Sequence, residues 1–171
     1  MSATTPAREG LLTDLARGFA AQKASAERAM EQVDDGAFFT TLGSDENSIG
    51  IIAKHMSGNL LSRFTDFLTS DGEKPSRNRD GEFEVAGAES RESVMAQWGR
   101  GWSTLESALA SLTPADLSRT IHIRGEPATA LQALLRALAH QAQHAGQIVL
   151  LAKHLAGENW TTLTIPRPGK R

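Results

Sequence analysis

The sequence contains no cysteine, and this absence excludes several kinds of site. A chain of 171 residues without a thiol has no disulfide framework, no thiolate metal site and no cysteine nucleophile. Candidate metal ligands must therefore be sought among histidines and carboxylates.

The sequence also lacks long apolar runs and a strong net charge. No run approaches the roughly 18 apolar residues of a membrane span, and residues 1–10 lack the apolar centre of a signal peptide, so we expect a cytoplasmic protein. The net charge of -2 gives no broad electrostatic reason to bind nucleic acid or an anionic membrane. We therefore expect neither partner.

What the sequence does contain is helical periodicity. In four long stretches, apolar residues recur every three or four positions, and polar caps or glycines flank these stretches. We expect an all-α fold, a four-helix bundle forming a single domain over residues 1–171. The expected helices run from about Thr5 to Val33, from Ser48 to a stop at Ser70-Asp71-Gly72, from Ser90 to Leu112, and from Pro127 to Leu155.

The segments between these helices are less regular. Residues 34–47 are polar and rich in turn-forming residues, and residues 119–124 alternate as a short extended piece would. Residues 70–85 are dense in charge and include Pro75 and Gly81, which predicts a long loop between the second and third helices. Loops of this length inside a compact domain are often functional.

The last predicted helix carries a histidine pair, His140 and His144. Side chains four residues apart on a helix lie one above the other, with Cβ atoms about 5–6 Å apart, so the two imidazoles can share one divalent ion. Ala133 and Ala137 precede them on the same column of the helix, and their small size leaves room for a ligand.

Two ligands seldom define a metal site, and His55 is the best candidate for a third. It lies in the middle of the second predicted helix among apolar residues, where an unpaired imidazole would be costly to bury. His154 is ten residues beyond His144, or about 15 Å along a helix, so we expect it at the surface. We expect His122 to face solvent.

Two amides are candidates for contacts with a bound cofactor or substrate. Asn59 follows His55 by four residues, and Gln147 follows His144 by three. Gln147 can equally form a structural hydrogen bond between helices, and the sequence leaves both interpretations open.

At these residues the chain resembles the DinB superfamily, and most closely a subgroup long catalogued as a domain of unknown function. The resemblance extends along nearly the whole chain. It is carried by Ile52-Ala-Lys-His55-Met-Ser-Gly-Asn59, by Arg63 and Asp66, by Asn78-Arg79-Asp80, by Ile123-Arg124-Gly125-Glu126, by His140-x-x-x-His144-x-Gly146-Gln147-Ile148, and by Trp160 and Ile165-Pro166 in the tail.

The resemblance implies a four-helix bundle with one divalent metal ion held by His55, His140 and His144. Members of the superfamily include metal-dependent transferases and isomerases that use low-molecular-weight thiols, and homodimers are frequent among them. Two positions depart from the subgroup's pattern, since Gln141 stands where an aromatic residue often follows the first histidine of the pair and Phe64 stands where tryptophan is usual. Neither change removes a ligand.

Three functional hypotheses follow. The first is a metal-dependent enzyme, a thiol-dependent S-transferase or isomerase, with zinc as the default ion and nickel or iron as alternatives. Its substrate would be a small molecule such as a low-molecular-weight thiol. The second is a stress-associated protein that binds a metal and a small ligand without turnover. The third is a dimerisation module whose histidines bind nothing. The sequence shows no obvious general base beside the site.

Overall fold

The computed structural model describes residues 5–84 and 89–165, and the side chains from residue 10 onward. In this part of the chain the protein is mostly helical, with five α-helices and one small two-stranded sheet. Four of the helices are long: α1 (Thr5–Met30), α3 (Ile49–Phe64), α4 (Arg91–Ser111) and α5 (Ala130–Ala156). The predicted all-α class is thus supported, apart from the short hairpin.

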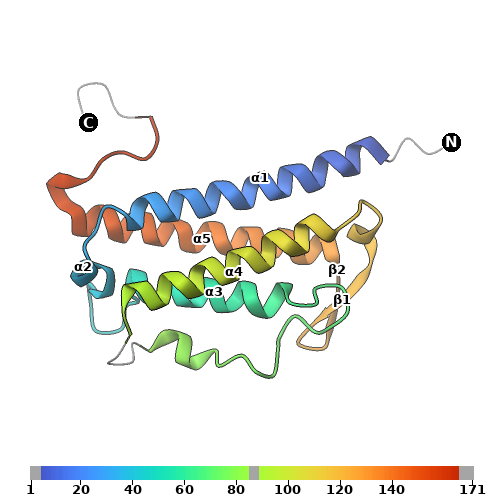
Figure 1. Ribbon diagram of the computed structural model, residues 1–171, viewed down its shortest axis with the longest axis horizontal. Coiled ribbons are helices and arrows are strands. Elements are labelled where there is room, and N and C mark those ends of the chain that lie inside the picture. Colours follow the sequence, from blue (N-terminus) through green and yellow to red (C-terminus); the bar gives the residue numbers. More distant parts are fainter. Residues whose placement is uncertain (1–4, 85–88, 166–171) are drawn as a thin grey trace.

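The long helices lie side by side in two closely packed pairs, α1 with α5 and α3 with α4 (Figure 1). α3 also contacts α5, and this contact places the second and last long helices next to each other. Trp98 and Trp102 of α4 are each 1% exposed, so they belong to the core and not to a binding surface. In the part of the chain that the structure describes, no helix combines the length and the apolar character that a membrane span requires.

Local capping chemistry explains where three of the long helices begin. Ser48 accepts a hydrogen bond from the Ile51 amide at the start of α3. Capping boxes begin α4, through Ser90 and Ser93, and α5, through Thr129 and Gln132. Each cap satisfies amide groups that a helix N-terminus would otherwise leave unpaired.

Two predicted helix boundaries were wrong. α3 ends at Phe64, not near Ser70, because Thr65 is extended and Asp66 has a positive φ of 49°, which stops the helical ladder. α5 begins at Ala130, not at Pro127, because Pro127 pairs with His122 in a hairpin.

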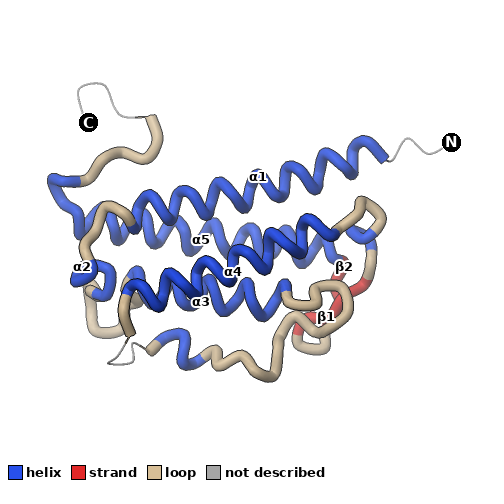
Figure 2. Tube along the Cα trace, in the orientation of Figure 1, coloured by secondary structure: helices blue, strands red, loops and turns tan. Residues whose placement is uncertain are grey.

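That hairpin consists of β1 (Thr120–Ile123) and β2 (Glu126–Thr129), which pair antiparallel (Figure 2). Arg124 and Gly125 form its turn, both with positive φ, and only the glycine adopts this conformation without steric cost. The sequence predicted the first strand but not the second. It also missed the short helix α2 (Asp35–Phe39), which Asp34 caps and whose Phe38 is fully buried.

The predicted loop after α3 is present and packs along α3. It contains one short 3₁₀ turn (Asp80–Phe83), and Lys54 of α3 secures it by donating to the Gly81 and Glu84 carbonyls and to the Glu89 carboxylate. Val85, the last residue of the predicted loop, and Pro166 of the tail lie outside the described residues.

Candidate metal centre

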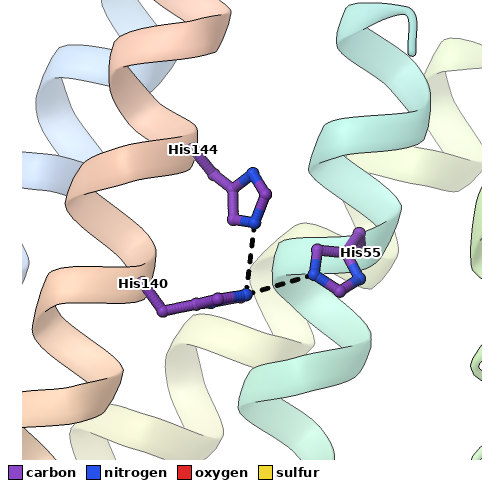
Figure 3. A group of neighbouring side chains, drawn as sticks. All are labelled: His55, His140 and His144. Carbon is purple, nitrogen blue, oxygen red and sulfur yellow. Dashed lines mark hydrogen bonds between the residues drawn. The ribbon is translucent and has the colours of Figure 1, made fainter. Parts of the chain in front are cut away.

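Three histidines from two helices converge at one point (Figure 3). His55 comes from α3, and His140 and His144 come from successive turns of α5. The Nε2 atom of His140 is 3.1 Å from that of His55 and 3.2 Å from that of His144. A tetrahedral ion with bonds of about 2.0–2.1 Å holds its nitrogen ligands about 3.3 Å apart, so this donor set can hold one metal ion. The structure therefore brings together the three predicted ligands.

The hydrogen bonds made by the outer ring nitrogens, Nδ1 of His55 and of His144, also fit a cation at the centre of the cluster. His55 Nδ1 faces the Glu82 carboxylate at 3.0 Å, and His144 Nδ1 faces the Gln147 amide oxygen at 2.7 Å. Both partners accept hydrogen bonds, so each Nδ1 carries a proton, and either ring in its neutral form presents a bare Nε2 lone pair inward. His140 Nε2 lies between the Nε2 atoms of His55 and His144, and a single proton on it can be donated to only one of them. A metal ion would satisfy all three nitrogens at once.

The charge state of the cluster suits a metal as well. Burial, reinforced by the neighbouring rings of His144 and His55, lowers the pKa of His140 to about 4. Burial also lowers the pKa of His144, although the hydrogen bond with Gln147 acts in the opposite direction. Both imidazoles are therefore neutral at pH 7, which is the form that binds metals.

A carboxylate that the sequence did not predict orients His55. Glu82, from the 3₁₀ turn of the loop, accepts from His55 Nδ1 and is held by Arg77, whose Nε and Nη2 donate to the two carboxylate oxygens at 2.7 and 2.8 Å. Burial favours a higher pKa for Glu82, but the hydrogen bonds from His55 and Arg77 outweigh it and hold the pKa below its usual value. Glu82 is thus ionised, and a carboxylate of this kind fixes a ligand's tautomer and makes it a better donor.

Gly58 makes room for this carboxylate. It lies on α3 one turn after His55, and a Cβ atom at this position would collide with the Glu82 side chain. Glu82 can approach His55 only because the helix carries no side chain there. This was the one available clue to the missing partner: a glycine inside an apolar helix, three residues from a buried histidine, next to a charged loop.

Further ion pairs fix the loop beside the site. Glu73 is bound by Arg63 of α3 at 3.1 Å, by Arg77 at 3.3 Å and by Arg124 of the hairpin turn at 3.0 Å. Asp71 accepts hydrogen bonds from the Arg124 and Gly125 amides. The loop is therefore tied to both α3 and the hairpin.

The two predicted cofactor contacts differ in their surroundings, since Asn59 lines a pocket and Gln147 bonds to a histidine of the cluster. Asn59 is 9% exposed and lines a pocket of about 180 Å³ that adjoins His55 and His140. Gln147 is not an interhelix link, because it bonds to His144 within α5. The expected space beside the alanines is present, since Ala133 and Ala137 line the same pocket.

The remaining histidines lie outside the cluster, as expected. His122, on β1, and His154, in the last turn of α5, are both exposed. Neither belongs to a group of described residues that could hold a metal ion.

Comparison with known proteins places almost the whole chain in one family. The model of a family described as "Protein of unknown function (DUF1572)" matches residues 8–169. No curated protein and no solved structure shows a significant match.

Proposed function

The chain belongs to the DUF1572 family of proteins of unknown function, and we propose that it is a metal-dependent enzyme in which His55, His140 and His144 hold one divalent ion. One observation carries the proposal: three inward Nε2 atoms converge next to a pocket of about 180 Å³. Three neutral imidazoles leave coordination positions free, which is typical of catalytic rather than structural metal sites.

Zinc is the ion we propose, and nickel and iron also accept imidazole ligands. The proposal further assigns the chain to the DinB superfamily, with its long helices forming the bundle of that superfamily and two chains forming a homodimer. The motifs around His55 and around the His140–His144 pair support this assignment.

The reaction we propose is a transfer or isomerisation that uses a low-molecular-weight thiol. Because the chain contains no cysteine, the thiol comes from a second molecule. When bound, a divalent ion with open positions supplies Lewis acidity, which lowers the pKa of a thiol that reaches it. In a transfer, the sulfur forms a bond to an electrophilic carbon, the leaving group departs with the bonding electron pair, and the thiol proton passes to solvent.

The chain's own groups would prepare this chemistry. Burial keeps His140 and His144 neutral. Glu82 and Gln147 hold the protons of His55 and His144 on the outer nitrogens, so that the inner nitrogens stay free to bind a cation. Asn59, at the pocket wall, can orient a substrate with its amide.

A second candidate is binding without turnover, and one observation favours it. Three described carboxylates contact residues that line the pocket, those of Asp71, Glu73 and Glu82, and all three are engaged by hydrogen bonds or ion pairs. A general base would have to leave such a partner before it could accept a proton.

The test is turnover with a panel of thiols and electrophiles. We expect product formation that requires the metal-loaded protein and is lost in His140→Ala, whereas His154→Ala, which removes an exposed histidine from the same helix, retains it. Tight thiol binding without product would establish the binding function instead. No turnover and no thiol binding by the metal-loaded protein would refute both.

A further inference from the structure

The pocket beside the histidines is lined by an unusual number of arginines. Arginines from four elements face it, and none of its described lining residues is acidic. The arginines are Arg63 of α3, Arg77 and Arg79 of the loop, Arg124 of the hairpin turn, and Arg136 of α5. This concentration of positive charge stands out in a chain whose net charge is -2.

Nearby carboxylates neutralise only part of this charge. Glu82 pairs with Arg77, and Glu73 is shared among Arg63, Arg77 and Arg124. Among the described residues the other acidic partners are Asp71, whose half-buried carboxylate accepts from the Arg124 and Gly125 amides, and Asp80, which is 95% exposed. Asp80 lies 3.8 Å from Arg79, so water screens that pair. Five guanidiniums against three buried or half-buried carboxylates, those of Glu82, Glu73 and Asp71, leave the pocket positive.

Two of the arginines have donors to spare. Arg136 forms no ion pair or hydrogen bond with any described residue. Arg124 donates to Glu73 through Nε alone, so its terminal nitrogens remain free. Arg136 also precedes His140 by one helical turn, a separation of about 5–6 Å between Cβ atoms, so a ligand can reach both.

We propose that this pocket is an oxyanion subsite that binds a carboxylate or phosphate group of the substrate, with Arg136 and Arg124 as the donors. The proposal rests on the proposed function, because the other end of the same substrate reaches the metal ion. Guanidinium groups match the geometry of carboxylates and phosphates.

The pocket volume limits the substrate. Pockets for drug-sized ligands span about 300–1,000 Å³, and this one has about 180 Å³. It holds a small acid, or the acidic end of a larger molecule. The substrate class is therefore a small thiol or electrophile with an acidic group a few bonds from its reacting atom.

The first test compares two thiols that differ only in the acidic group. The protein is loaded with Co²⁺ in place of zinc and titrated with 3-mercaptopropionate and with 3-mercapto-1-propanol, and binding is followed by the thiolate-to-cobalt absorption band. We expect the carboxylate to bind about tenfold more tightly or better, since a charge-assisted hydrogen bond contributes about that factor. Arg136→Met should abolish most of this preference.

Arg100→Met is the matched control. Arg100 is an exposed arginine on α4 that does not line the pocket, so the substitution changes the net charge equally. It should keep the wild-type preference. Equal affinity of the wild type for both thiols, or an undiminished preference in Arg136→Met, would overturn the proposal while leaving the metal centre intact.

The second test is independent of the metal. Metal-free protein is titrated calorimetrically with inorganic phosphate at pH 7.5 and low salt. We expect binding that Arg136→Met weakens about tenfold and Arg100→Met leaves unchanged. If Co²⁺ does not bind but phosphate does, the proposed function fails and the oxyanion subsite stands. If phosphate does not bind the metal-free wild type, the subsite is refuted whatever the metal does.

Discussion

Glu82→Gln tests how the loop supports the metal centre. Glu82 is 6% exposed, and its carboxylate holds both the Nδ1 proton of His55 and the guanidinium of Arg77. The amide keeps the size and one acceptor oxygen but loses the charge. Removing a partner that orients a metal-bound histidine typically lowers metal affinity about 10- to 100-fold, and we expect that range here.

The same substitution should also cost stability. Breaking a buried ion pair by removing one partner costs about 3–5 kcal/mol. Arg77 keeps its contact with Glu73 at 3.3 Å, so we expect the lower end of that range, about 3 kcal/mol in the free energy of unfolding of the metal-free protein.

The assay separates these two effects. Zinc affinity is measured on folded protein by competition with a chromophoric chelator at pH 7.5, and stability is measured by urea unfolding of the metal-free protein. Glu84→Gln is the control, because Glu84 is an exposed neighbour in the same loop. A folded Glu82→Gln protein with wild-type zinc affinity would refute the role we assign to this carboxylate.

Three further predictions use other parts of the site. Gly58→Ala should lower zinc affinity although it changes no ligand, because the new Cβ collides with the Glu82 carboxylate. Chelator competition measures the affinity, and Gly146→Ala, whose new Cβ meets nothing within 4 Å, is the control that should keep the wild-type value. Gln147→Leu should lower zinc affinity about tenfold, near the lower end of the range for partners of metal-binding histidines, because the bond of Gln147 to His144 is exposed. Equal zinc affinities in the wild type and in Gln147→Leu would contradict this role. Asp71→Asn should destabilise the protein at neutral pH, because backbone hydrogen bonds from Glu73, Gly125 and Arg124 lower the pKa of Asp71 to about 2. A depressed carboxyl pKa contributes stability that is present above about pH 4 and lost as the pH falls toward 2, so urea unfolding should show the difference from wild type shrinking over that interval; a constant difference would argue against it.

Local signals made much of the helical fold predictable. The helix starts at Ser48 and Ser90 were predicted correctly, because a capping side chain acts on amides only two or three residues away. The turn at Asp66 carries no glycine or proline, so nothing in the sequence marked the true end of α3. Pro127 is compatible with a first helical position and with a strand, and pairing with His122 decided between them.

The histidine cluster was predictable for a related reason. The spacing of His140 and His144 places both on one face of a helix, and a histidine in an apolar helix needs a partner, which pointed to His55. Glu82 was not predictable as its partner. Its approach depends on how a charged loop folds back over α3, and its neighbours in sequence include several equally acidic residues.

The arginine pocket was missed because the sequence scatters it. Arg63, Arg124 and Arg136 come from separate elements, and only the tertiary contacts of the hairpin and loop bring them together. In the sequence, the loop's three basic residues are outnumbered by its five acids. In the folded protein the arginines line the pocket, whereas Glu73 and Asp71 do not line it and are bonded to the surrounding loop and hairpin.

Metal content is the most direct measurement of the central claim. Protein made without a histidine tag is loaded with zinc, dialysed against metal-free buffer and analysed for metal together with a His55→Ala, His140→Ala, His144→Ala triple variant. The account predicts close to one ion per chain in the wild type and almost none in the variant. A wild-type protein that is folded yet essentially free of metal, or a variant that retains as much as the wild type, would contradict it.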